Sequence, residues 1–178
     1  NKAPAYFDMK KLLHINAEYI RALSPEAFVV IVNEYFQLIN WQPTNFDLHV
    51  ISGLSSPIQE RIEKLADIVN LVDWLFDEEP ATETDPKEIK KISKSMSADK
   101  VTDVLDLAIE QLGKCDWNEE VIGETINGIG QLLETKSQVP IRVAVTGRRI
   151  GLPLFKPMEI LGRQKVIRRL QKARADLG

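Results

Sequence analysis

The chain has 178 residues and a mass of 20.2 kDa, with 44% hydrophobic and 28% charged side chains. This composition is typical of a globular protein and too apolar for intrinsic disorder, and no apolar run approaches the roughly 18 residues of a membrane span. One cysteine and two histidines argue against a disulfide framework and against a Cys/His metal site. The sequence starts at Asn1 without a leader pattern, so we expect a segment of a longer protein.

Charge is distributed unevenly along the sequence. Residues 141–178 hold ten Lys and Arg against two acidic residues, whereas residues 1–140 hold thirteen basic and twenty-four acidic ones. The pI near 5.5 argues against non-specific nucleic-acid binding. The basic end still permits a specific contact with an anionic partner. The alternative is a solvated basic helix docked on an acidic neighbour.

Apolar residues recur at helical spacing along almost the whole chain, which predicts an all-α fold. Asp8 predicts the start of a first helix, and Ser24-Pro25 predicts the start of a second. Residues 40–55 are expected to form a loop around one short helix. Ser56-Pro57 then predicts the start of a long helix that carries apolar residues as far as Leu75.

Residues 77–88 predict a linker, because they hold six acids, two prolines and no large apolar side chain. It would separate one helical subdomain at 1–80 from a second at 81–178, which ends in a basic helix. Further helix starts are expected at Asp85-Pro86, Ser97 and Asn118. Residues 140–147 suit a short helix at least as well as a strand. Glycines at expected helix ends are Gly113, Gly147 and Gly162.

No combination of residues predicts an active site, so we assign no catalytic residue and no metal ligand. His14 lies beside Leu13 and Ile15 and is expected to be packed or half-buried. Residues 91–95 resemble the Lys-Met-Ser-Lys-Ser loop of class I aminoacyl-tRNA synthetases. That loop acts together with a nucleotide-binding domain and a His-Ile-Gly-His motif, and this chain has neither. We therefore interpret residues 91–95 as a solvated helix end.

Other motifs point to the same enzymes. Residues 6–21 resemble the Phe-Asp-x-x-Lys-Leu-x-x-(Met/Ile)-Asn-x-x-Tyr-Ile-Arg segment of bacterial glutamyl-tRNA synthetases, and residues 57–65 look like the Glu-Arg-x-x-x-Leu helix of that family. Residues 74–76 match the aromatic end of the same region. The blocks that match the C-terminal signature of the family are 142–147, 151–155, 158–162 and 168–170.

The resemblance implies an anticodon-binding half of a glutamate–tRNA ligase, built as an all-α cage of two packed helical subdomains. Its partners would be the anticodon loop of tRNA-Glu and the N-terminal catalytic domain of the same protein, in a monomer of the cytoplasm that does not contact membranes. No cofactor is expected here, because ATP and Mg belong to the catalytic half. The chain alone should therefore be inactive as an enzyme.

The resemblance also places Arg61 at the position that contacts the third anticodon base. Cytosine offers two acceptors, O2 and N3, to a guanidinium group, whereas guanine presents mainly donors on that edge. Glutamate anticodons end in C and glutamine anticodons end in G, so one Arg could separate them. The alternative is a surface ion pair of Arg61 with Glu60 or Glu63.

A second group of candidate anticodon contacts follows the resemblance near the C-terminus. Arg142 matches another anticodon-contacting arginine, on a turn that ends at Thr146 and Gly147, and its alternative role is a structural salt bridge. Arg148 and Arg149 are candidates for phosphate contacts. Tryptophans that could stack on bases are Trp41, Trp74 and Trp117, of which the last two are expected in the core.

Two alternatives remain open at this point. The chain could be a freestanding helical adaptor that binds protein partners through its basic C-terminal helix. It could also belong to a non-discriminating synthetase that charges tRNA-Gln as well, although Arg61 argues against that.

Overall fold

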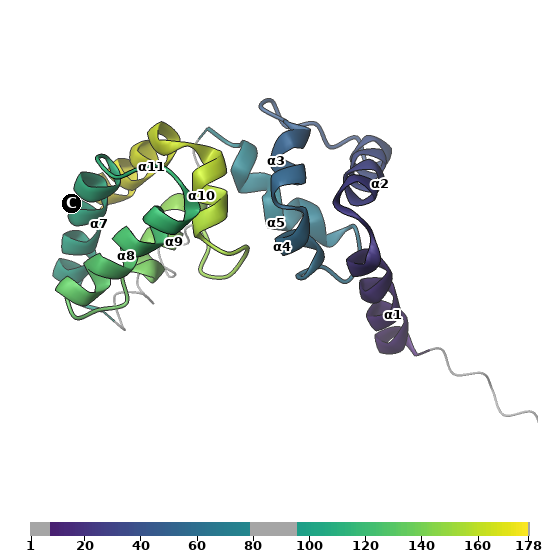
Figure 1. Cartoon of the computed structure of the whole chain (residues 1–178), viewed down its shortest axis with the longest axis horizontal. Coiled ribbons are helices and arrows are strands. Elements are labelled where there is room, and N and C mark those ends of the chain that lie inside the picture. The colour runs from purple at the N-terminus through teal and green to yellow at the C-terminus, as the bar shows by residue number, and fades with distance from the viewer. Residues whose placement is uncertain (1–7, 79–95, 178) are drawn as a thin grey trace, which may run out of the picture. The chain divides into compact units, whose positions relative to one another are not determined.

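The structure is a computed structural model that describes residues 8–78 and 96–177. Over these residues it contains helices and no strand, which confirms the all-α fold class (Figure 1). The helices are α1 (Met9–Ala22), α2 (Pro25–Leu38), α3 (Leu48–Gly53), α4 (Ser55–Gln59), α5 (Asp67–Phe76), α7 (Ala98–Leu112), α8 (Glu119–Leu132), α9 (Gln138–Thr146), α10 (Phe155–Leu161) and α11 (Arg163–Ala175).

The chain divides into two compact units, residues 1–72 and 73–178, and the division falls within α5. Apart from Asp77 and Glu78, the predicted linker at 77–88 lies outside the described residues. The predicted helix start at Asp85-Pro86 and the segment 91–95 lie outside them as well.

Side-chain caps confirm four of the predicted helix starts. Each capping side chain accepts a hydrogen bond from the backbone amide three residues further on, at 3.0–3.4 Å, which satisfies an amide that has no partner within the helix. The capping residues are Asp8, Ser24, Ser97 and Asn118. Residues 140–146 are helical rather than extended. They form most of α9, and Gly147 caps this helix with a φ of 71° that glycine adopts without steric cost.

The core of the first unit forms where α2 packs on α3 and α4, and α1 packs on α4. An aromatic cluster lies beside it: the ring of Phe36 is 4.5 Å from that of Trp41 and 5.6 Å from that of Phe46. Trp41 therefore packs against its own chain and is half-buried. The buried apolar residues of this unit are Ala17, Ile20, Phe28, Val32, Phe36, Ile51, Leu54, Ile58, Ile62, Ile68 and Val72.

The predicted long helix from Ser56-Pro57 to Leu75 is wrong. Two helices replace it, because α4 ends at Gln59 and α5 begins only at Asp67. The carboxylate of Asp67 accepts hydrogen bonds from the amides of Glu63 (3.2 Å) and Lys64 (3.1 Å), so these amides bond a side chain instead of helical carbonyls. Residues 60–66 form an irregular turn as a result.

The expectation of a packed His14 is also wrong. The buried residues of α1 are Ala17 and Ile20, whereas 69% of the His14 side chain is exposed and its Nε2 lies 3.4 Å from Oε1 of Glu18. Adjacent residues point to different sides of a helix, so apolar neighbours at positions 13 and 15 do not place His14 in the core.

The second unit is built around α7, which packs on α8, α9 and α11, while α10 packs on α8 and α11. Trp74 is only 4% exposed and belongs to this core, as expected. Trp117 is half-buried, its indole N–H donates to the carbonyl of Glu159 at 3.2 Å, and the guanidinium of Arg163 lies 5.6 Å from its ring centroid. Both tryptophans are therefore engaged within the protein.

Candidate nucleic-acid interface

Arg61 lies on the turn at residues 60–66, which hydrogen bonds within the first unit hold just before its start and at its middle. The side-chain amide of Gln59, only 6% exposed, donates to the carbonyls of Ile20 (2.7 Å) and Leu23 (3.0 Å) at the end of α1. In the middle of the turn, the Glu63 carbonyl accepts a hydrogen bond from the Asn16 side chain at 2.5 Å. These bonds satisfy backbone groups at a helix end and in the turn, so they position Arg61 as well as α1.

Arg61 itself points away from the core, as the sequence predicts, although it is not on a helix. Ile58 and Ile62 on either side of it are fully buried, whereas Arg61 is exposed. Its Nη1 donates to the Pro57 carbonyl at 3.3 Å and lies 3.9 Å from a carboxylate oxygen of Glu60. An exposed ion pair of this length contributes little to stability.

A second candidate surface lies in the other unit, at the end of α9. We call residues 146–149 the 146–149 turn. The hydroxyl of Thr146, a buried residue, accepts from the Arg148 amide and donates to the Arg148 carbonyl, both at 3.1 Å. The Gly147 amide donates to the Val143 carbonyl at 2.8 Å. Thr146 and Gly147 thus shape the turn, and the arginines that follow are the parts of it that can reach outward.

Arg142 braces the loop that follows the turn. Its side chain is half-buried, and Nη1 donates to the Leu152 carbonyl at 2.7 Å, across the residues that connect α9 to α10. This hydrogen bond to a charged donor holds both ends of the loop together. The structure therefore brings Arg142, Thr146, Gly147, Arg148 and Arg149 together around one loop. Arg61 belongs to the other unit.

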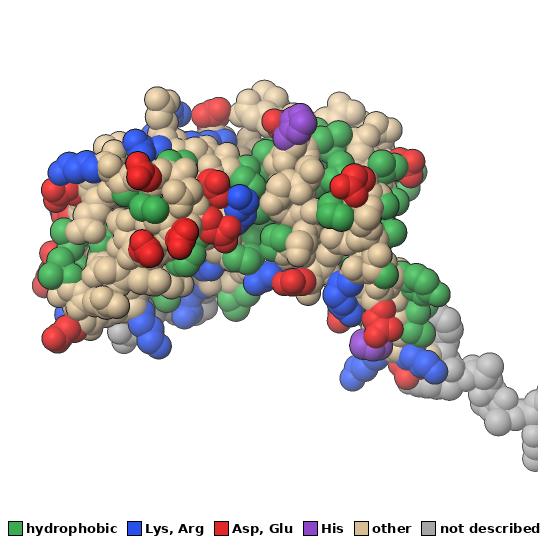
Figure 2. Space-filling model, viewed as in Figure 1, with side chains coloured by type: hydrophobic (Ala, Val, Ile, Leu, Met, Phe, Trp, Pro, Cys, Tyr) green, Lys and Arg blue, Asp and Glu red, His purple; other side chains and the backbone are tan. Residues whose placement is uncertain are grey.

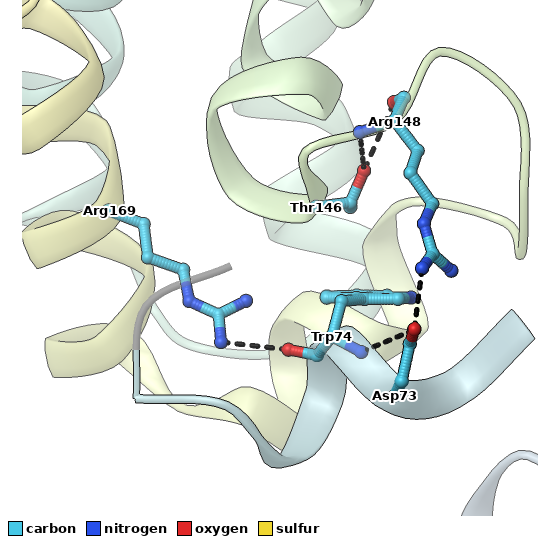
Figure 3. A network of polar contacts seen from close by, with 5 residues as sticks. All are labelled: Asp73, Trp74, Thr146, Arg148 and Arg169. Carbon is cyan, nitrogen blue, oxygen red and sulfur yellow. Dashed lines mark hydrogen bonds and ion pairs between the residues drawn. The ribbon is translucent and has the colours of Figure 1, made fainter. Parts of the chain in front are cut away.

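Arg148 is held in place by a carboxylate from α5. Its Nη2 lies 2.7 Å from Oδ2 of Asp73, and the other oxygen of Asp73 accepts from the Trp74 amide at 2.7 Å (Figure 3). Both charged side chains are about one-third exposed, so the pair is reachable by an anion. Arg149 is exposed, and Ile150 next to it is 88% exposed. An apolar side chain at such a loop tip offers a surface for the face of a base or a sugar.

Sequence reasoning missed several of these residues. Asn16, Gln59 and Asp73 position the candidate arginines, yet their partners lie far away in the sequence, so no local pattern indicates their role. Ile150, which follows two arginines and precedes a glycine, gave no usable signal either, because single exposed apolar residues are common on protein surfaces.

The distribution of charged side chains over the surface bears on how this acidic protein would bind a polyanion. On the face drawn in Figure 2, acidic and basic side chains of the described residues are interspersed. A mixed surface of this kind gives little non-specific attraction for nucleic acid, so binding on this face would depend on a few placed cations.

The described residues contain neither a candidate membrane span nor a candidate metal site. Within residues 8–78 and 96–177, no helix has both the length and the apolar character of a membrane span. In the same two ranges, no three His, Cys, Asp or Glu side chains come together as ligands for a metal ion.

Comparisons with known proteins identify the family. A family profile described as an anticodon binding domain matches residues 19–174. The glutamate–tRNA ligase of Frankia alni is 39% identical over 180 residues, which cover 98% of this chain and 37% of the relative. That of Streptomyces griseus is 37% identical over 183 residues, which cover 99% of this chain and 35% of the relative. The chain thus spans little more than a third of the length of these relatives.

Solved structures support the fold. A glutamate tRNA ligase from Elizabethkingia meningosepticum, solved in complex with its amino acid, superposes with a TM-score of 0.80 at 22% identity, over 100% of this chain and 34% of that one. A glutamate–tRNA synthetase from Elizabethkingia anophelis gives a TM-score of 0.74, also at 22% identity, over 98% of this chain and 33% of that one. From the profile match and these relatives, the chain belongs to the anticodon-binding domain family, in the form that glutamate–tRNA ligases carry.

Proposed function

We propose that this chain binds the anticodon loop of tRNA-Glu within a glutamate–tRNA ligase, whose catalytic part attaches glutamate with the use of ATP and Mg. The observation that carries the proposal is the family match over residues 19–174, together with an exposed Arg61 on a braced turn inside that range. The chain contributes recognition and has no catalytic residue of its own. We place the protein in the cytoplasm as a monomer.

The catalytic part of the same protein is the second proposed partner. Helix α1 presents Met9, Leu12 and Tyr19 to the outside, with 55%, 45% and 73% of their surface exposed. Apolar side chains in such a row suit packing against another protein surface. This chain covers little more than a third of each relative, so the remaining part of such a ligase is the surface that we expect to pack on this row of side chains.

The test of the proposed function is a titration of the chain with tRNA. We expect saturable binding to tRNA-Glu and clearly weaker binding to the same tRNA with a replaced anticodon. Fluorescence anisotropy of labelled tRNA at fixed ionic strength measures both affinities. Equal affinity for the two tRNAs, or no binding to either, would contradict the proposal.

A freestanding adaptor that binds proteins through a basic helix is less well supported, because α11 uses its cations within its own unit. Arg169 is 2% exposed, Arg174 bonds the carboxylate of Asp106 at 2.9 Å, and Arg168 lies 3.4 Å from a carboxylate oxygen of Glu78. A helix whose arginines bond its own unit offers few of them to a separate partner.

Removing the charges of Arg148 and Arg149 should flatten the salt dependence of tRNA binding. Each phosphate contact to a single strand contributes about 0.7 to the slope of log affinity against log salt concentration, so the double replacement by Gln should reduce the slope by about 1.4. Preference for the anticodon should not change, because phosphates carry no base identity. Affinities measured between 50 and 200 mM salt would show the effect.

Lys114→Gln is the matched control for this experiment. Lys114 is an exposed cation of the same unit that bonds Glu110 on α7 at 2.8 Å and is not part of the 146–149 turn. Its replacement removes one positive charge and should leave the slope unchanged. A double Arg148/Arg149 variant with the wild-type slope would mean that these arginines do not contact the RNA backbone.

A further inference from the structure

Arg169 is a buried cation at a point where the C-terminal ends of two helices meet. Its Nη1 donates to the Val145 carbonyl in the last turn of α9 at 2.8 Å. Its Nη2 donates to the carbonyls of Trp74 (2.9 Å) and Asp77 (2.6 Å), in the last turn of α5 and just beyond it. Carbonyls at a helix C-terminus have no partner within the helix and carry the negative end of its dipole. One guanidinium therefore satisfies the ends of both helices.

Packing alone does not explain an arginine at this position. Its guanidinium lies 5.8 Å from the ring centroid of Trp74, and its Nε is buried without a hydrogen-bond partner among the described residues. Burial lowers the pKa of Arg169 to about 10, against the opposing effect of Asp77 and Glu78, so the group stays charged at neutral pH. Burying a charge is costly, and an apolar side chain of similar volume often stabilises a core better. An apolar residue, however, could not donate hydrogen bonds that link the end of α5 to the end of α9.

The tie continues into the 146–149 turn. Val145, whose carbonyl Arg169 holds, directly precedes Thr146, which shapes the turn through its bonds to Arg148. Arg148 in turn bonds Asp73, which is adjacent to Trp74. Figure 3 shows Arg169 and Arg148 approaching the Asp73–Trp74 pair from two different elements. The end of α5 is thus linked to the last turn of α9 through Arg169 and to the 146–149 turn through Arg148.

We propose that Arg169 is a positioning residue for RNA binding, which fixes the end of α9 on α5 so that the 146–149 turn presents its arginines in one arrangement. The proposal rests on the proposed function, since it assigns the turn a role in binding tRNA. Arg169 itself does not touch the RNA, because it is 2% exposed. Arg169 raises the affinity because it holds the turn in its binding conformation beforehand, so RNA binding does not have to supply the free energy of ordering the turn.

Arg169→Met removes the tie while keeping a long side chain. We expect the affinity for tRNA-Glu to fall about tenfold, which corresponds to the loss of one charge-assisted hydrogen bond. The affinity is measured at a temperature where circular dichroism shows the variant to be folded. The matched control is Ile126→Ala, which truncates a fully buried residue of α8 in the same unit. The Ile126 carbonyl accepts from Ser137, which precedes α9 at the end opposite the turn. This control should lose stability and keep its affinity within about twofold.

Arg169→Lys provides a second measurement that does not need the Met variant to fold. A single ammonium group cannot bond carbonyls on two helix ends as a planar guanidinium does. Hydrogen exchange of the Gly147 and Arg148 amides, which bond Val143 and Thr146, should accelerate about tenfold, while the Ile141 amide in the first half of α9 keeps its rate.

The outcomes separate the two proposals. Wild-type protein that does not prefer tRNA-Glu would contradict the proposed function, whatever Arg169 does. Wild-type protein that binds with preference, together with an Arg169→Met variant that binds equally well, would leave Arg169 with a purely structural role and overturn the inference. Unchanged exchange of the Gly147 and Arg148 amides in Arg169→Lys would overturn it as well.

Discussion

Replacing Arg61 by Gln in the full-length ligase should narrow its preference for an anticodon that ends in C over one that ends in G by roughly one order of magnitude or more. A bidentate contact between an arginine and a base contributes about 1–3 kcal/mol of discrimination in DNA recognition, and the same donor geometry fits the O2 and N3 atoms of cytosine. Gln can both donate and accept, so it should tolerate either base. The measurement is kcat/KM for the natural tRNA and for its third-base C→G variant, with both enzymes.

The structure makes this experiment interpretable. Arg61 is exposed, donates a 3.3 Å bond to the Pro57 carbonyl and lies 3.9 Å from Glu60, and surface contacts of this kind contribute little, so its replacement should change the free energy of unfolding by less than about 1 kcal/mol. Lys64→Gln is the control, because Lys64 is an exposed cation of the same turn that pairs with Asp67 at 3.8 Å. It should keep the wild-type ratio of the two tRNAs. A wild-type ratio in Arg61→Gln would reduce Arg61 to a surface ion-pair residue.

The same experiment distinguishes the two kinds of synthetase. If the parent enzyme charges both tRNAs equally before any replacement, it is non-discriminating, and Arg61 does not exclude guanine. If it prefers C and loses that preference in Arg61→Gln, the discrimination depends on this arginine.

Local features of the fold were predictable from the sequence. Asp8, Ser24, Ser97 and Asn118 cap helices because a short polar side chain bonds an amide three residues away, and that information lies within one turn of chain. The burial of Ile58 and Ile62 beside an exposed Arg61 was equally readable from spacing. The irregular turn that carries Arg61 was not predictable, because the amides of Glu63 and Lys64 bond the Asp67 carboxylate instead of helical carbonyls.

Residues that hold the candidate site together were not predictable, because their partners are distant in sequence. Arg148 bonds a residue 75 positions away, and Arg169 bonds the Trp74 carbonyl 95 positions away. A partial signal did exist for Arg169. It lies three residues after Val166 and directly before Leu170, both fully buried, so the helical period places it on the inner face of α11. Periodicity can predict such burial, but it cannot identify the carbonyls that make burial tolerable.

Trp74→Ala should be the most destabilising single change considered for the second unit, at about 3–5 kcal/mol, the usual cost of truncating a buried aromatic side chain. Trp74 is 4% exposed, and its ring lies against the guanidinium of Arg169. Removal of the Trp74 ring leaves a cavity, and the buried guanidinium of Arg169 loses the aromatic face that lies against it. Denaturant unfolding followed by circular dichroism measures the loss without depending on tryptophan fluorescence.

Trp117→Ala serves as the comparison, because Trp117 is half-buried and also has an arginine against its ring. It loses less buried area, so we expect a smaller loss of stability than for Trp74→Ala. Two variants of Trp74 also show whether this residue stacks on a base of the RNA. If Trp74 acts only by filling the core, Trp74→Phe, which retains a buried ring, should bind tRNA-Glu as the wild type does. A Trp74→Ala protein with wild-type stability but weakened tRNA binding would instead place this ring against the RNA and contradict its assignment to the core.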